Sequence, residues 1–164
     1  MDILTLRVEL LTPEAFAPFG DVIAPRESEA NHAVNAGTAV RFHALGTVDV
    51  VGDDARALIS IFRAQPRALP FDVIMLERHP LGSQAFVPMD PRQRYIVVVA
   101  ESPESQPRAF LAANGQGVNY RRGCWHHPLI ALDRESDFLV VDRGGTGVNC
   151  EEVSLSVRCR IEGV

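Results

Sequence analysis

The stretch LERHPLGSQAFVPM, residues 76–89, places an acid, an imidazole and an amide within eight residues. The apolar run Val73–Leu76 leads into it and predicts a strand. Successive side chains of a strand point to opposite faces, so Met75, Glu77 and His79 are expected on one face. A carboxylate and an imidazole two positions apart could share a pocket as metal ligands or as an acid–base pair. The plainer alternative is a strand that ends in a polar turn.

A turn and a second strand follow this segment. Pro80 and Gly82 predict the turn. Gln84–Pro88 predicts the strand, with Gln84 and Phe86 on the same face. We expect this second strand to pair with the one that precedes the turn.

The rest of the chain repeats this pattern of short strands and turns. Thr12 and Pro13 predict the N-cap and the first residue of one short helix, and Pro18 and Gly20 predict its end. Many short strands with one helix predict an all-β sandwich or barrel, in a single domain over residues 1–164. Further strands are expected at residues 3–8, 21–23, 40–43, 58–64, 95–100, 108–112, 129–132 and 138–143.

Two parts of the chain give other signals. Residues 25–39 are polar and small, which predicts a long loop. His32 and His43, in and near this segment, are interpreted as surface or loop histidines rather than as ligands. The C-terminal part, including residues 149–152, shows only weak strand signals.

Composition excludes several classes of function. The formal net charge of −5 provides no electrostatic footprint for nucleic acid, and no apolar run is long enough to cross a membrane, so neither partner is expected. All 16 basic residues are arginine, which excludes a lysine Schiff base, a pyridoxal phosphate anchor and a Walker lysine. No organic cofactor is expected. Three cysteines without CxxC spacing favour reduced thiols in a cytoplasmic protein.

A second polar segment lies at residues 114–128. It contains two glycines near its start, a basic pair, the only tryptophan, and the adjacent histidines His126 and His127. It does not predict a phosphate-binding loop, because no helix pattern follows it. Neighbouring residues of a strand face opposite ways, so at most one of the two histidines is expected to point inward.

The first segment resembles the first motif of the cupin superfamily, whose members are β-barrels of the double-stranded β-helix or jelly-roll type. That motif has the form His-x-His, then three or four residues, then Glu. Glu77 stands in place of the first His, His79 matches the second, and Gln84 stands where Glu is expected. The resemblance implies an all-β, cupin-like β-barrel with one short N-terminal helix.

The second segment resembles the second cupin motif, which has the form Gly-x5-Pro-x-Gly-x2-His-x3-Asn. Gly115, Gly123 and His126 match this spacing, which favours His126 over His127 as the inward residue. Arg121 and Ile130 replace the Pro and Asn of the motif. The two altered ligand types also leave room for a metal-free site. The two motifs together imply a divalent metal ion held by Glu77, His79, Gln84 and His126.

A closer resemblance, to the ureidoglycolate lyase family, covers nearly the whole chain. It implies a cytoplasmic, cupin-like homodimer that splits ureidoglycolate into glyoxylate and urea in allantoin degradation, with nickel or another divalent ion associated. The stretches that carry it are residues 13–16, 20–23, 63–66, 76–82, 84–86, 114–120, 125–129 and 142–145.

The chemistry of this substrate sets three tasks. A cation must hold the carboxylate, a base must take the hydroxyl proton, and an acid must protonate the leaving nitrogen. Arg63 is assigned to the carboxylate, and Arg121 is a second candidate for it. Gln84 is assigned as a fourth metal ligand or as a hydrogen-bond donor to the ureido group. Proton transfer or metal ligation is assigned to Glu77, His79 and His126.

Three other interpretations stay open at this point. The chain could be a cupin isomerase or dioxygenase that acts on another small acid, a barrel that binds a metabolite without turnover, or a structural barrel. Lyase action and ammonia-releasing hydrolysis use similar groups, so residue types do not separate them.

Overall fold

The computed structural model describes residues 3–164, which form fifteen strands, one α-helix and one 3₁₀ helix. In chain order they are β1 (Ile3–Thr5), β2 (Val8–Leu10), α1 (Pro13–Phe16), β3 (Gly20–Ile23), β4 (His32–Val34), η1 (Asn35–Gly37), β5 (Ala39–Arg41), β6 (Arg56–Ala64), β7 (Phe71–Arg78), β8 (Gln84–Pro88), β9 (Tyr95–Ala100), β10 (Arg108–Ala112), β11 (Gly117–Tyr120), β12 (Trp125–His126), β13 (Ile130–Ala131), β14 (Ser136–Gly144) and β15 (Glu151–Ile161).

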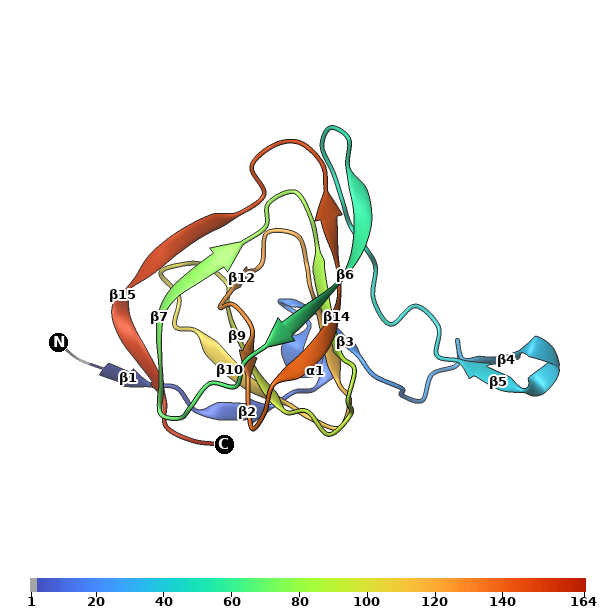
Figure 1. Ribbon diagram of the computed structural model, residues 1–164, viewed down its shortest axis with the longest axis horizontal. Helices are drawn as coiled ribbons and strands as arrows, with labels where there is room; N and C mark the ends of the chain where they lie inside the picture. Colours follow the sequence, from blue (N-terminus) through green and yellow to red (C-terminus); the bar gives the residue numbers. More distant parts are fainter. Residues whose placement is uncertain (1–2) are drawn as a thin grey trace.

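Two curved sheets face each other and enclose one interior (Figure 1). The large sheet has eight strands in the order β1-β15-β7-β12-β9-β10-β2, with β13 also paired to β9. The small sheet has five strands in the order β3-β11-β8-β14-β6. The expected all-β barrel with one short helix is therefore confirmed. None of the helices in residues 3–164 has the length and hydropathy needed to cross a bilayer.

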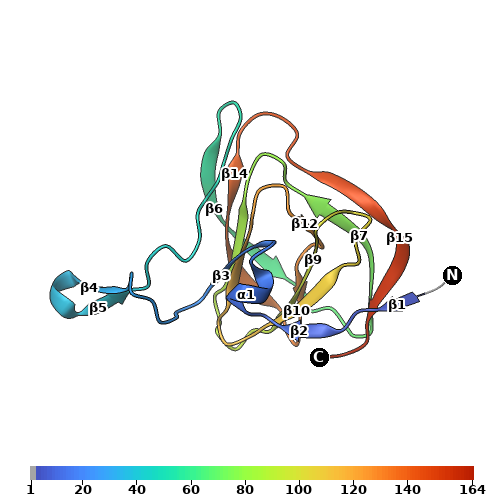
Figure 2. The same cartoon turned by 180° about the vertical axis from the view of Figure 1, so that it is seen from behind.

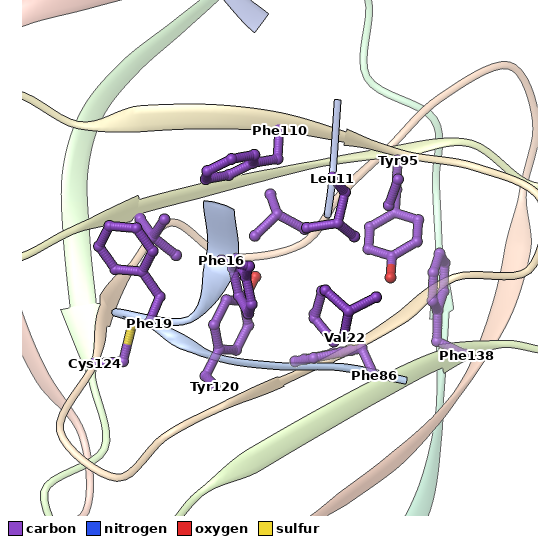
Figure 3. Packing of buried hydrophobic residues seen from close by; sticks show 14 of the residues in the cluster. Leu11, Phe16, Phe19, Val22, Phe86, Tyr95, Phe110, Tyr120, Cys124 and Phe138 are labelled. Atoms are coloured by element: carbon purple, nitrogen blue, oxygen red, sulfur yellow. The ribbon is translucent and has the colours of Figure 1, made fainter. Parts of the chain in front are cut away.

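The helix α1 joins the edge strand β2 of the large sheet to the edge strand β3 of the small sheet, and it closes that side of the barrel. Its start is as predicted, because the Thr12 hydroxyl oxygen accepts a hydrogen bond from the backbone N–H of Ala15 and Pro13 is the first helical residue. Phe16 is fully buried and packs edge-on against Phe110, with Tyr120 on its other side (Figure 3).

Strand β9 is buried on both faces, as its continuous apolar run predicts. Tyr95, Val97 and Val99 belong to the cluster that fills the barrel interior, where Tyr95 packs edge-on against Phe138 (Figure 3). Ile96 belongs to a second cluster of buried apolar residues, which also contains side chains from β7 and β15. The large sheet therefore carries apolar packing on both of its sides.

The predicted pairing of the strands on either side of the turn at residues 79–83 is wrong. Strand β8 pairs with β11 and β14 in the small sheet, whereas β7 pairs with β15 and β12 in the large sheet. The turn thus carries the chain from one sheet to the other instead of closing a hairpin. Local alternation fixes which face a side chain takes but not which strand lies beside it.

The segment at residues 25–39 is not a plain loop. Strands β4 and β5 pair in an antiparallel hairpin around η1, and this hairpin projects away from the barrel on the side of the small sheet (Figures 1 and 2). The predicted strand at residues 3–8 is also divided, because β1 pairs with β15 and β2 pairs with β10.

The C-terminal part forms β15, an eleven-residue strand that pairs with β7. The signal was present in the sequence, because apolar residues alternate with polar ones along it. They are Val153, Leu155, Val157, Cys159 and Ile161.

Candidate active site

A cavity of about 530 Å³ opens between the edge strand β6 of the small sheet and strands β7 and β12 of the large sheet. Polar groups line its large-sheet wall, and the aromatic rings of Phe62 and Phe86, packed edge-on, line the opposite wall. The lining residues are Phe62, Arg63, Ala64, Glu77, His79, Gln84, Phe86, His126, Pro128 and Leu129.

Strand register brings Glu77 and His126 together. They are direct partners in the β7–β12 pairing, so their side chains leave the same face of the sheet. His126 Nε2 lies 3.4 Å from Glu77 Oε1, and His79 Nε2 lies 3.9 Å from the same oxygen. The two imidazole rings are 5.1 Å apart. The expectation that Glu77 and His79 share a pocket with the second motif is thus met in the geometry.

Two backbone carbonyls fix the orientation of the imidazoles. His79 Nδ1 lies 2.8 Å from the carbonyl oxygen of Asn149, and His126 Nδ1 lies 3.0 Å from that of Cys124. A carbonyl oxygen only accepts, so each Nδ1 must carry the proton and donate it. In the neutral rings, each Nε2 therefore presents a lone pair towards Glu77.

Gln84 adds an amide oxygen to this group as a fourth acceptor. Its amide nitrogen donates to Asp142 Oδ2 at 3.3 Å, which turns Oε1 towards His79 Nε2, 3.1 Å away. The amide oxygen rather than the N–H thus faces the centre, and this orientation favours a ligand role for Gln84 over a donor role. Asp142 lies on β14, and no local spacing in the sequence relates it to Gln84.

The carboxylate of Glu77 is held in its charged form. Whenever His126 also carries a proton on Nε2, its contact with Glu77 is the largest influence and lowers the pKa of Glu77 below its ordinary value, and a protonated His79 acts in the same direction. Partial burial opposes this by disfavouring the charged form. Glu77 is therefore an anion at neutral pH.

This donor set fits a divalent cation. The ligand atoms of Glu77, His79 and His126 all lie within 4.8 Å of one another. His126 is only 2% exposed, and its Nε2 is a buried polar atom with no hydrogen-bond partner among residues 3–164. Buried polar groups are ordinarily satisfied, so lone pairs that converge without a proton between them are suited to a metal ion.

The neighbouring aromatic rings place His126 inward and His127 outward. The ring of Tyr120 stacks on His126 with centroids 4.2 Å apart, and Tyr120 is part of the barrel interior (Figure 3). His127 packs edge-on against Phe71, and its Nδ1 lies 2.8 Å from the carbonyl oxygen of Pro128. The cupin spacing therefore selected the inward-facing histidine.

The two arginines assigned to the substrate lie in different places. Arg63 lines the cavity, but its side chain is 66% exposed, and its guanidinium donates to both carboxylate oxygens of Asp137, at 2.8 and 3.0 Å. Arg121 is exposed in the turn after β11 and is not among the residues that line the cavity. The structure therefore brings together Glu77, His79, Gln84 and His126, with Arg63 at the rim and Arg121 apart.

Comparisons with known proteins agree with one another. The family model described as ureidoglycolate lyase matches residues 3–162. A ureidoglycolate lyase from Burkholderia cepacia is 56% identical over 160 residues, which is 96% of this chain and 90% of that protein. The chain belongs to the ureidoglycolate lyase family.

Another member of the ureidoglycolate lyase family shows a similar sequence identity to this chain. A ureidoglycolate lyase from Brucella melitensis is 54% identical over 159 residues, covering 95% of this chain and 93% of that protein. Among solved structures, a dTDP sugar isomerase from Desulfovibrio desulfuricans aligns with a TM-score of 0.48 and 13% identity, over 85% of this chain and 87% of that one.

Proposed function

We propose that this chain is a ureidoglycolate lyase that splits ureidoglycolate into glyoxylate and urea. One observation carries the proposal: Glu77, His79, Gln84 and His126 direct one carboxylate, two imidazole lone pairs and an amide oxygen into a single cavity. Membership of the family names the reaction class, and the reaction needs neither the lysine nor the organic cofactor that the chain lacks.

The reaction is an elimination with a closed balance of atoms. The hydroxyl on the substrate's central carbon loses its proton, its oxygen forms the aldehyde of glyoxylate, and the bond from that carbon to the ureido nitrogen breaks. The electron pair of that bond leaves with the nitrogen, which takes up one proton to give urea. No water, oxidant or reductant is consumed, so a positioned base and acid suffice.

We assign the proton transfer to Glu77. Its carboxylate is charged at neutral pH and faces the cavity, so it can accept the hydroxyl proton. The same carboxyl can then return that proton to the leaving nitrogen, because the reaction releases one proton and consumes one. His79 and His126 lie against the Glu77 carboxylate, 3.9 and 3.4 Å away, and hold it in place.

The same side chains would hold a divalent ion, and nickel is the candidate that the family resemblance suggests. Glu77, His79 and His126 would supply three ligands and the Gln84 amide oxygen a fourth. Such an ion lowers the pKa of a hydroxyl group that binds to it. Asp142 would then act as a positioning residue, since it sets the direction of the Gln84 oxygen.

Arg63 is the residue that we propose to bind the substrate carboxylate, because it is the only arginine among the residues that line the cavity. Its contact with Asp137 uses Nε and one terminal nitrogen, which leaves the other terminal nitrogen for the substrate. The three cysteines are free thiols, which supports a cytoplasmic location, and the family resemblance supports a homodimer.

Product analysis tests this proposal. Purified protein is incubated with racemic ureidoglycolate, and glyoxylate, urea and ammonia are measured separately against a protein-free control, before and after chelation. We expect glyoxylate and urea in equal amounts without ammonia. Ammonia in place of urea would indicate a hydrolase, and no acceleration over the control would leave a barrel that binds a metabolite without turnover.

A further inference from the structure

The projecting hairpin, which we define as the arm (residues 32–43), has two unlike faces. The β4–β5 register sets His32 opposite Arg41, and the rings of His32 and His43 lie 5.7 Å apart, so these three side chains share one face. Val40, which is 60% exposed, lies on the other face, and Phe42 continues the alternation there. The arm is therefore basic on one side and apolar on the other.

The basic face of the arm is unpartnered within residues 3–164. The arm contains no acidic residue, and Arg41 makes no ion pair or side-chain hydrogen bond with the described part of the chain. Figures 1 and 2 show the arm extending clear of the barrel in both views. A two-stranded hairpin alone is marginally stable in water, so a partner surface would stabilise it.

The cavity needs positive charge that its own chain does not supply freely. Its lining and rim carry the carboxylates of Glu77, Asp142, Asp137 and Glu135, against the single guanidinium of Arg63. That guanidinium already forms a bidentate pair with Asp137. Even with a divalent ion held by Glu77 and the two imidazoles, the rim carboxylates of Asp137 and Glu135 would repel an anionic substrate, so a further cation at the mouth would favour its binding. The basic face of the arm is complementary to this acidic rim.

The small sheet also has an exposed apolar outer face beside the cavity. Ile59 is 78% exposed and Ile61 is 56% exposed on the edge strand β6, and Ile61 lies opposite the exposed Leu139 on β14. Soluble proteins rarely expose such cross-strand apolar patches unless another surface covers them. The next position along this face of β6 is Arg63, at the rim of the cavity, so the patch and the cavity mouth are continuous.

We propose that a second copy of the chain covers this face and that the arm of each subunit crosses to the other, where its Arg41 completes the binding site for the substrate carboxylate. A two-fold axis makes the exchange reciprocal, so both sites gain an arginine from the opposite subunit. The apolar face of the arm packs on the small-sheet face, and His43 lies beside Arg41 at the cavity mouth. The inference rests on the proposed function for the identity of the anion.

Mixed dimers test the crossing. Arg41→Ala should lower kcat/KM by about 10–100-fold, mostly through KM, because a charge-assisted contact to the substrate is lost. Arg41→Ala and Glu77→Gln subunits are then co-expressed with different tags, and the mixed dimer is purified through both tags. One of its two sites combines an intact barrel with an intact arm. The kcat/KM per dimer should therefore return to about half of the wild-type value.

A matched pair of defects controls this result. A mixed dimer of Glu77→Gln and His126→Ala carries both defects in the barrel, so neither site is intact and no activity should return. A mixed dimer of Arg41→Ala and Glu77→Gln whose kcat/KM does not rise above that of the Arg41→Ala parent would overturn the proposal. A wild-type chain that sediments as a monomer would do the same.

Cross-linking separates this inference from the assigned reaction. Cys150 is exposed, and its Sγ lies 3.9 Å from Glu77 Oε2, so it marks the site without reference to activity. With Arg41→Cys in the arm, a short bis-maleimide should join two subunits covalently, and Cys150→Ser should abolish that product. Absence of the covalent dimer would overturn the crossing arm, whereas a cross-linked protein without turnover would overturn only the proposed reaction.

Discussion

His79 and His126 each donate the Nδ1 proton to a backbone carbonyl, and this pair of contacts determines what the centre can do. Both Nε2 atoms are left facing the Glu77 carboxylate, with the Gln84 oxygen beside them. Four acceptor atoms converge, which is the arrangement that a metal ion or an additional proton satisfies. The reactivity of the site therefore depends on single atoms rather than on the residue types alone.

The first prediction at this scale concerns Glu77. Glu77→Gln keeps the shape of the side chain but removes its charge, so turnover of ureidoglycolate should fall by about 10²–10⁴-fold. Glu152→Gln is the matched control, because Glu152 is an exposed carboxylate next to Glu77. It should keep kcat close to the wild-type value. Steady-state kinetics on variants with wild-type circular dichroism make the measurement, and equal activity of both variants would remove Glu77 from the reaction.

The second prediction concerns divalent ions. Mutation of residues that only orient a metal ligand weakens metal binding by roughly 10–100-fold. His126→Ala removes a ligand itself, so its affinity for nickel should fall by at least that much. His127→Ala is the control, since His127 packs against Phe71 outside the cavity. Equilibrium dialysis against Ni²⁺ after chelation measures both. If His127→Ala loses the ion and His126→Ala keeps it, the ligand assignment is wrong.

At the scale of elements, the four-residue helix α1 is stabilised at both of its ends. Thr12 caps it, and Phe16 anchors it in the interior cluster between the two sheets. Thr12→Ala removes the side-chain acceptor for the Ala15 N–H and should lower the free energy of unfolding by about 1 kcal/mol. Thr12→Ser retains that acceptor and should lie near the wild type. Urea denaturation measures the difference, and equal stability of Ala and Ser variants would contradict the capping role.

The turn after β7 shows how far local patterns reach. Alternation along β7 and β8 predicts that Glu77 shares a face with His79 and that Gln84 shares a face with Phe86, and the cavity contains all four. The pairing of β7 with β8 was wrong, because the two strands belong to opposite sheets. Since the sheets face each other, this separation is what lets Gln84 meet His79 across the interior.

At the scale of the whole molecule, the exposed outer face of the small sheet predicts self-association. Ile61→Glu places a charge at the centre of the proposed interface and should weaken dimerisation at least about tenfold. Ile74→Glu is the matched control, because Ile74 is a comparably exposed isoleucine on β7 of the large sheet. Sedimentation equilibrium over a range of concentrations compares them. A dimer that tolerates Ile61→Glu would place the interface elsewhere.

Local sequence patterns predicted the strand-rich fold and the single capped helix, and the resemblance to the cupin motifs favoured His126 as the inward histidine and placed Glu77, His79 and Gln84 in one site. These features follow from short-range rules, namely alternation along a strand, capping and motif spacing. Four features became visible only in the folded chain. Asp142 orients Gln84, and Asp137 binds Arg63. Arg121 lies away from the cavity, and residues 32–43 form an arm. These features depend on which strands lie side by side and where the chain crosses between sheets. Such long-range pairings leave no periodic signal in the local sequence.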